Sequence, residues 1–88
     1  MPPTSITLIN EFKDQINVCV CGKDFVSMYT LEKGENIPIK EFNTKSKVAV
    51  IAAFGAAGII NGTGQGCAEI ELMGGMHYDI RMHPKTAP

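Results

Sequence analysis

The 88-residue chain contains no tryptophan, few charged residues and no apolar run long enough to cross a bilayer. Charged residues make up 19% of the sequence, and eight basic against nine acidic residues give a formal net charge of -1. Because proteins that neutralise nucleic-acid phosphates carry a basic stripe, this balanced and dispersed charge argues against a nucleic-acid partner. The longest apolar run, 48–60, has 13 residues, whereas a transmembrane helix needs about 20.

The chain also lacks a recognisable targeting segment. Its first residues, Met-Pro-Pro-Thr-Ser, have neither the basic nor the apolar region of a secretory signal peptide. Two compartments therefore stay open, the cytoplasm and, after removal of a signal peptide, the outside of the cell. No polybasic segment indicates binding to anionic lipids.

Cysteine is scarce, and its count is odd. Cys19, Cys21 and Cys67 allow at most one disulfide and leave one thiol. The Cys-x-Cys spacing of the first two is too short for a zinc knuckle. The sequence favours reduced thiols and leaves three alternatives open, namely one bridge to Cys67, metal ligation and an intermolecular disulfide.

One apolar and uncharged stretch, 48–60, dominates the sequence and ends in a glycine-rich segment. Its β-branched start, Val-Ala-Val-Ile, favours a strand over 48–54. Since both faces of that strand are apolar, we expect a central strand covered on both sides, with a bend or bulge at Gly55 or Gly58. The alternative is a helix over residues 45–60, which would make the fold α+β.

The rest of the chain is divided into short segments with the composition and alternation of β-strands. They span residues 5–10, 15–21, 25–31, 37–42, 67–73 and 77–82. The turn sequences Gly-Lys-Asp and Gly-Gly predict two hairpins, one joining 15–21 to 25–31 and the other joining 67–73 to 77–82. Pro38 restricts its segment to the edge of a sheet, because it has no N–H group to donate.

Six to seven short strands within 88 residues predict an all-β protein, a small β-sandwich or barrel. We expect a single domain over 1–88 with frayed ends at 1–4 and 83–88. This length is near the lower limit at which a hydrophobic core alone supports a fold. An apolar strand rich in alanine and glycine in so small a domain also predicts a homo-oligomer.

The glycine-rich loop Asn-Gly-Thr-Gly-Gln-Gly is the first candidate for a binding site. It precedes a predicted strand, whereas phosphate-binding glycine loops open a helix, so we interpret it as the lip of a binding site for a glycan or a protein. Polar loop tips on a rigid scaffold are common binding positions. The candidate ligand-binding residues are Asn61, Thr63 and Gln65, with Lys23 and Asp24 from the first hairpin turn.

A second candidate site consists of soft metal ligands. Cys19 and Cys21 share one face of a predicted strand, and Met76 and His77 lie together at the second hairpin turn. Thiolate, thioether and imidazole are the ligands that Cu(I) prefers. These four residues would make the protein a copper-binding carrier or sensor.

The first hypothesis for the function is a non-enzymatic, lectin-like interaction module that self-associates and presents loops to a glycan or protein partner. No orienting third group stands at a recognisable spacing beside a cysteine–histidine pair, which argues against catalysis and against a catalytic cofactor. The copper-binding protein is the first alternative. The second alternative is a membrane-associating, toxin-like protein that inserts the small apolar residues of 52–60 partway into lipid.

Overall fold

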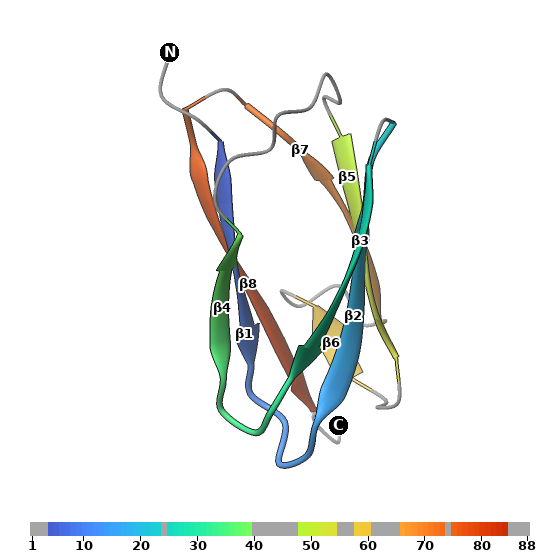
Figure 1. The fold of residues 1–88 in the computed structure, drawn as a ribbon, viewed down its shortest axis with the longest axis vertical. Coiled ribbons are helices and arrows are strands. Elements are labelled where there is room, and N and C mark those ends of the chain that lie inside the picture. The colour runs from blue at the N-terminus through green and yellow to red at the C-terminus, as the bar shows by residue number, and fades with distance from the viewer. Residues whose placement is uncertain are drawn as a thin grey trace.

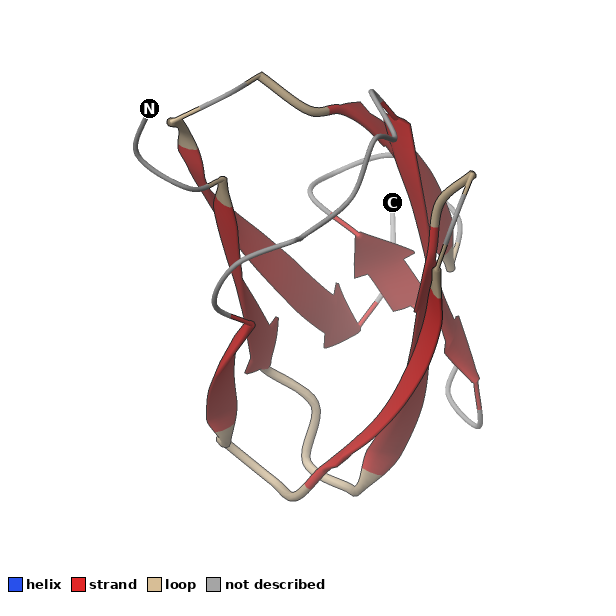
Figure 2. Ribbon diagram, turned by 45° about the horizontal axis from the view of Figure 1, so that its top comes forward, coloured by secondary structure: helices blue, strands red, loops and turns tan. Residues whose placement is uncertain are grey.

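A computed structural model gives the structure of the protein for most of the chain. It describes residues 4–23, 25–39, 48–54, 58–60, 66–73 and 75–84. The described strands form two four-stranded sheets that lie face to face (Figures 1 and 2). The predicted all-β sandwich is therefore confirmed, with one strand, Gly58–Ile60, beyond those that the sequence predicted.

Each sheet is built from strands of both halves of the chain. Sheet A has the order β4-β1-β8-β6, and its strands are β1 (Ser5–Asn10), β4 (Asn36–Ile39), β6 (Gly58–Ile60) and β8 (His77–Pro84). Sheet B has the order β3-β2-β5-β7, and its strands are β2 (Ile16–Cys21), β3 (Val26–Leu31), β5 (Val48–Phe54) and β7 (Cys67–Glu71).

The core lies between the two sheets and follows directly from the period of two along each strand. Sheet A contributes Ile6, Leu8, Ile39, Ile80 and Met82, and sheet B contributes Ile16, Val18, Val20, Leu31 and Ile51. All of these side chains are 9% exposed or less. The faces predicted from alternation in β2 and β8 are thus the faces that the structure buries.

β5 is the central strand that the sequence predicted, since it lies between β2 and β7. The alternative helix over 45–60 is wrong for the described residues 48–54 and 58–60, which are strands. Burial is one-sided, because Ala49 and Ile51 are fully buried whereas Val48 is 37% exposed. The expectation of cover on both faces therefore holds only for the inner face. Gly55 lies outside the described residues.

The first predicted hairpin is confirmed, and the second is wrong. β2 and β3 pair antiparallel around the Gly22 turn. β7, however, pairs with β5 in sheet B, while β8 pairs with β1 and β6 in sheet A. The turn contains a hydrogen bond from Met76 N to Met73 O at 3.2 Å, and Gly75 has a φ of 80°. The Gly-Gly signal thus marks a real turn that carries the chain from one layer to the other.

β1 and β8 form the central pair of sheet A and run parallel, in register from Ser5↔His77 to Asn10↔Met82. All other described pairs are antiparallel. Among the described strands, β4 pairs with β1 alone, at the edge position that Pro38 predicted. The first and last strands of the chain therefore lie side by side (Figure 1).

Of the ends that we expected to be frayed, residues 1–3 and 85–88 lie outside the described residues. His83 and Pro84 belong to β8 and stand opposite Ile59 and Gly58. Thr4 Oγ1 donates a hydrogen bond to Met73 O at 3.2 Å. In the described ranges no helix is present that could span a membrane.

Asn10, at the end of β1, is the buried polar side chain of the described core, with 1% exposure. Its Nδ2 lies 3.0 Å from Asp14 O, 3.2 Å from Leu31 O and 3.0 Å from Glu32 O. Its Oδ1 accepts a hydrogen bond from Phe12 N at 2.9 Å. A single amide thus ties the loop after β1 to the loop after β3.

Candidate functional site

The residues predicted for the binding lip are only partly within the described chain. Asn61, Thr63, Gln65 and Asp24 lie outside the described residues. Lys23 is described and is exposed in the turn between β2 and β3. Of the predicted lip, the structure therefore places Lys23.

Lys23 does not share an end of sheet B with the end of the glycine-rich loop. It follows Cys21, which stands opposite Val50 in the first half of β5. Gly66 closes the loop and accepts a hydrogen bond from Ala53 N at 2.9 Å, near the last residue of β5. The two predicted parts of the lip are thus attached at opposite ends of the same sheet.

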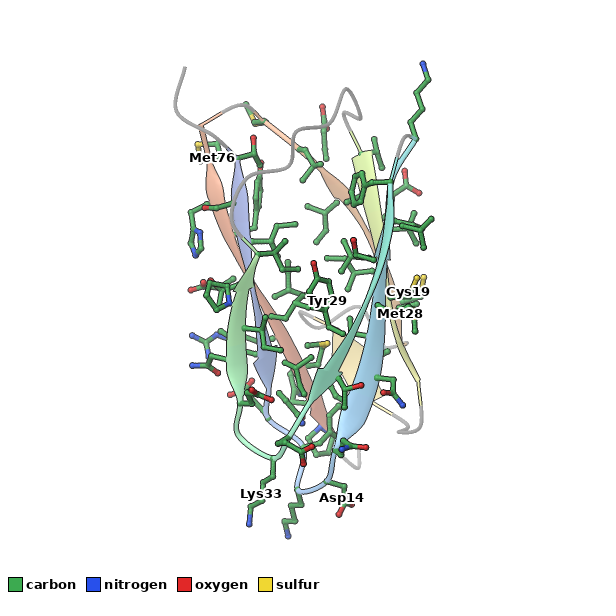
Figure 3. All side chains as sticks on the ribbon, in the orientation of Figure 1. Asp14, Cys19, Met28, Tyr29, Lys33 and Met76 are labelled. Carbon is green, nitrogen blue, oxygen red and sulfur yellow. The ribbon has the colours of Figure 1, made fainter. Side chains whose placement is uncertain are left out.

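The predicted copper ligands are likewise divided between the two sheets. Cys19 and Cys21 alternate with the buried valines of β2 and lie on the side of sheet B that faces away from the core. His77 is the first residue of β8 in sheet A. Met76 directly precedes it (Figure 3). Among the described residues, no group of three or more His, Cys, Asp or Glu side chains is placed to hold a metal ion. The four-residue copper site is therefore not assembled.

None of the three cysteines forms a disulfide in the described structure. Cys19 and Cys67 both stand opposite Ala52, on the two strands that flank β5. A bridge between them is excluded in this fold, because one whole strand separates them.

The three thiols share a surface that we call the outer face of sheet B. It comprises the apolar and thiol side chains of Cys19, Cys21, Val26, Met28, Val48, Val50, Ala52 and Cys67 and the polar side chains of Asn17, Thr30, Glu69 and Glu71. Figure 3 shows Cys19 and Met28 together on this side, while Tyr29 of β3 points between the sheets. Across the strands the face reads Met28–Cys19–Ala52–Cys67, a row without charge.

The most exposed large apolar side chains of this face lie on β3. Val26 is 72% exposed and Met28 is 61% exposed. Charge appears at the opposite side, where Glu69 and Glu71 of β7 are exposed. The outer face of sheet B therefore grades from an apolar side at β3 to an acidic side at β7.

A polar cluster lies on the outer side of sheet A, where β1 and β8 run parallel. Ser5 Oγ is 2.6 Å from His77 Nδ1, and His77 Nε2 is 2.9 Å from Asp79 Oδ1. Thr7 Oγ1 is 3.4 Å from the same Nε2. These residues meet because Ser5 stands opposite His77 and Thr7 opposite Asp79.

The hydrogen-bond network assigns the protons of this cluster. A carboxylate only accepts hydrogen bonds, so Nε2 of His77 carries the hydrogen directed at Asp79. In the neutral ring Nδ1 then accepts a hydrogen bond from the Ser5 hydroxyl. Hydroxyl, imidazole and carboxylate thus form a relay like that of serine hydrolases, with the two ring nitrogens exchanged.

Solvent exposure decides what this relay can do. The side chains of His77 and Asp79 are each 51% exposed. Preorganised hydrogen-bond donors contribute most to catalysis in a site that excludes water. At this exposed position, water would instead solvate any charge that develops on Ser5 or His77. We therefore interpret the cluster as a solvated contact between β1 and β8.

No protein-family model, curated protein or solved structure matches the chain. What the protein does is therefore inferred from its own residues.

Sequence reasoning missed the neighbours of His77. Ser5 and His77 are 72 residues apart, and only the parallel pairing of β1 with β8 joins them. One local signal was present, because His77 and Asp79 are two positions apart and share a face of any strand. The Ser5–His77–Asp79 relay could not be predicted without knowing that β1 pairs with β8.

Proposed function

We propose that the protein is a non-enzymatic interaction module that associates with a second copy through sheet B and presents loops to a glycan or protein partner. The observation that carries this proposal is the exposure of Val26 and Met28 on an uncharged strand. Removing an apolar side chain of this size from water is worth about 1.5–3 kcal/mol. Two such side chains per copy favour an interface over permanent exposure.

Two further features support an interface on this face. The neighbouring side chains Cys19, Cys21, Val50 and Ala52 are only partly buried and carry no formal charge in the thiol form. They would extend the apolar area from β3 toward β5. Interface cores are depleted of charged residues, and this composition fits that pattern.

The partner site belongs, in this proposal, to the glycine-rich loop. Asn61, Thr63 and Gln65 supply amide and hydroxyl groups, which are the groups that bind sugar hydroxyls or peptide backbone by hydrogen bonds. Lys23 is attached at the other end of sheet B, so it serves as an internal comparison for the loop.

Native mass spectrometry of the purified protein tests self-association. We expect a metal-free dimer or higher oligomer at micromolar concentration, because the apolar side of sheet B is covered only in an assembly. A monomer that carries one copper ion would instead support the alternative of a soft-metal protein, with Cys19 and Cys21 as its remaining ligand pair. A metal-free monomer would contradict both.

A glycan array probed with the labelled protein tests the loop. We expect the variant Thr63→Ala/Gln65→Ala to lose at least about tenfold of the signal, which corresponds to the net contribution of one or two hydrogen bonds. Lys23→Ala is expected to retain the signal. Equal binding by the double variant and the wild type would reject the loop assignment, and a wild type that binds no glycan would direct the search to a protein partner.

A further inference from the structure

The two sheets of described strands have four edge strands, and three of these carry a feature that hinders pairing with another chain. β4 contains Pro38, β6 has only three residues, and β7 exposes Glu69 and Glu71. Prolines, short length and charges are the devices by which proteins protect sheet edges. β3 has none of them: its six residues, Val-Ser-Met-Tyr-Thr-Leu, include no proline, glycine or charge.

The backbone of β3 is also directed toward a further strand. Gly22 N donates to Phe25 O at 2.9 Å, so these two residues form a hydrogen-bonded pair at the hairpin turn. Hydrogen-bonded and non-hydrogen-bonded pairs alternate along an antiparallel ladder. The pairs that contain Val26, Met28 and Thr30 are therefore of the second kind, and the N–H and C=O groups of these residues point away from β2.

In β3 the same residues have backbone groups that face the free edge and side chains that are exposed. The residues whose backbone groups point to the free edge, Val26, Met28 and Thr30, are also those with exposed side chains. Thr30 Oγ1 is held by a hydrogen bond to Asn17 Oδ1 at 2.8 Å. Within the described part of the chain, the edge thus offers peptide groups without a strand partner beside exposed apolar side chains.

We infer that a second copy of this chain pairs antiparallel with β3, about a twofold axis at Met28. This inference rests on the self-association proposed above and names its interface. Met28 then faces Met28 of the partner subunit, and Val26 faces Thr30 of the partner subunit. Every edge-facing residue enters a pair that exchanges two hydrogen bonds, whereas a twofold axis at Ser27 or Tyr29 leaves one such residue of each copy unpaired.

The charge distribution favours this edge for a symmetric contact. In a twofold interface each patch meets itself, so a charged edge repels its own copy. Pairing through β7 would bring Glu69 and Glu71 against the same glutamates, whereas the strand residues of β3, Val26–Leu31, include no charged side chain. Cross-strand contact of the two Met28 side chains adds to the backbone pairing. The two copies of sheet B become one continuous eight-stranded sheet.

Charged variants at Met28 test the interface. We expect Met28→Lys to raise the dimer dissociation constant at least about tenfold, because two like charges then stand directly opposite each other. The same is expected for Met28→Glu. An equimolar mixture of the two variants is expected to form the heterodimer, identified by its mass in native mass spectrometry. Met73→Lys is the matched control, because Met73 is also 61% exposed but lies after β7.

Amide hydrogen exchange provides a second measurement without substitution. At high protein concentration the amides of Val26, Met28 and Thr30 are expected to be protected, and on dilution they are expected to exchange as free edge amides. Protection that does not change with concentration would overturn the edge pairing. This readout stands even if a Met28 variant folds poorly.

The outcomes separate the inference from the proposed function. A wild-type monomer overturns both. A wild-type dimer that is unaffected by Met28→Lys and Met28→Glu overturns the β3 interface and leaves self-association in place. A dimer that is lost in each variant but not restored in their mixture overturns the twofold axis at Met28.

Discussion

Asn10→Asp is expected to destabilise the protein by roughly 3–5 kcal/mol, the cost of leaving a buried charge without compensation. The side chain is 1% exposed, and its Nδ2 faces the carbonyl oxygens of Asp14, Leu31 and Glu32. Aspartate has the same shape but offers no hydrogen to these oxygens. The substitution therefore places a carboxylate against three acceptors.

This loss is large relative to the total. A chain of 88 residues is expected to have a free energy of unfolding of roughly 4–13 kcal/mol. Asn17→Asp is the matched control, because Asn17 is exposed on β2 and its Oδ1 accepts from Thr30 Oγ1, which a carboxylate also does. We expect the control to change stability by less than about 0.5 kcal/mol.

Urea unfolding at one fixed protein concentration measures both variants. The concentration must be fixed because self-association makes apparent stability depend on it. Equal losses for Asn10→Asp and Asn17→Asp would show that the buried amide does not hold the two loops together.

Leu8→Ala is the second substitution with a large expected effect, a loss of about 2–5 kcal/mol. Leu8 is fully buried and lies in β1, opposite Ile37 on one side and Ile80 on the other. Truncation removes buried methyl groups and leaves a cavity at the centre of sheet A, where neighbouring strands restrict collapse. The same urea experiment gives the change in free energy.

Met73→Ala is the control for this cavity, because the Met73 side chain is 61% exposed and lies outside both sheets. Its expected effect is below about 0.5 kcal/mol. A loss below about 1 kcal/mol for Leu8→Ala would contradict the placement of β1 between β4 and β8.

The sequence predicted the parts of the fold that are encoded locally. The β2–β3 hairpin depends on alternation and on a turn of adjacent residues, and both lie within 15–31. The inward faces of β2 and β8 follow from the period of two. These features need no knowledge of distant segments.

Which strand pairs with which could not be predicted from local patterns. The alternation in β7 and β8 is satisfied equally by a hairpin and by two separate sheets. What decides is that β1 supplies Ile6 and Leu8 beside β8 in sheet A, and β1 is at the other end of the sequence. The same separation along the chain explains why the sequence did not predict the contact between Ser5 and His77.

The candidate sites show the same division. The shared face of Cys19 and Cys21 was predictable from β2 alone, and the structure places both on the outer face of sheet B. Whether Met76 and His77 lie near these cysteines was not predictable, because that depends on which sheet contains β8. The edge position of β3 could not be predicted either, because it depends on the order of the strands in sheet B.

The parallel pairing of β1 with β8 has a mechanical consequence. At one end of the pair Ser5 stands opposite His77, and at the other end Asn10 stands opposite Met82. Met82 is two residues before Pro84, the last residue of β8. Force applied between the start of β1 and the end of β8 therefore acts along the strands and shears them. All hydrogen bonds of the pair share that load at once, whereas in a hairpin pulled at its open end they would break one after another. The central pair of sheet A would thus resist a force that pulls the start of β1 and the end of β8 apart.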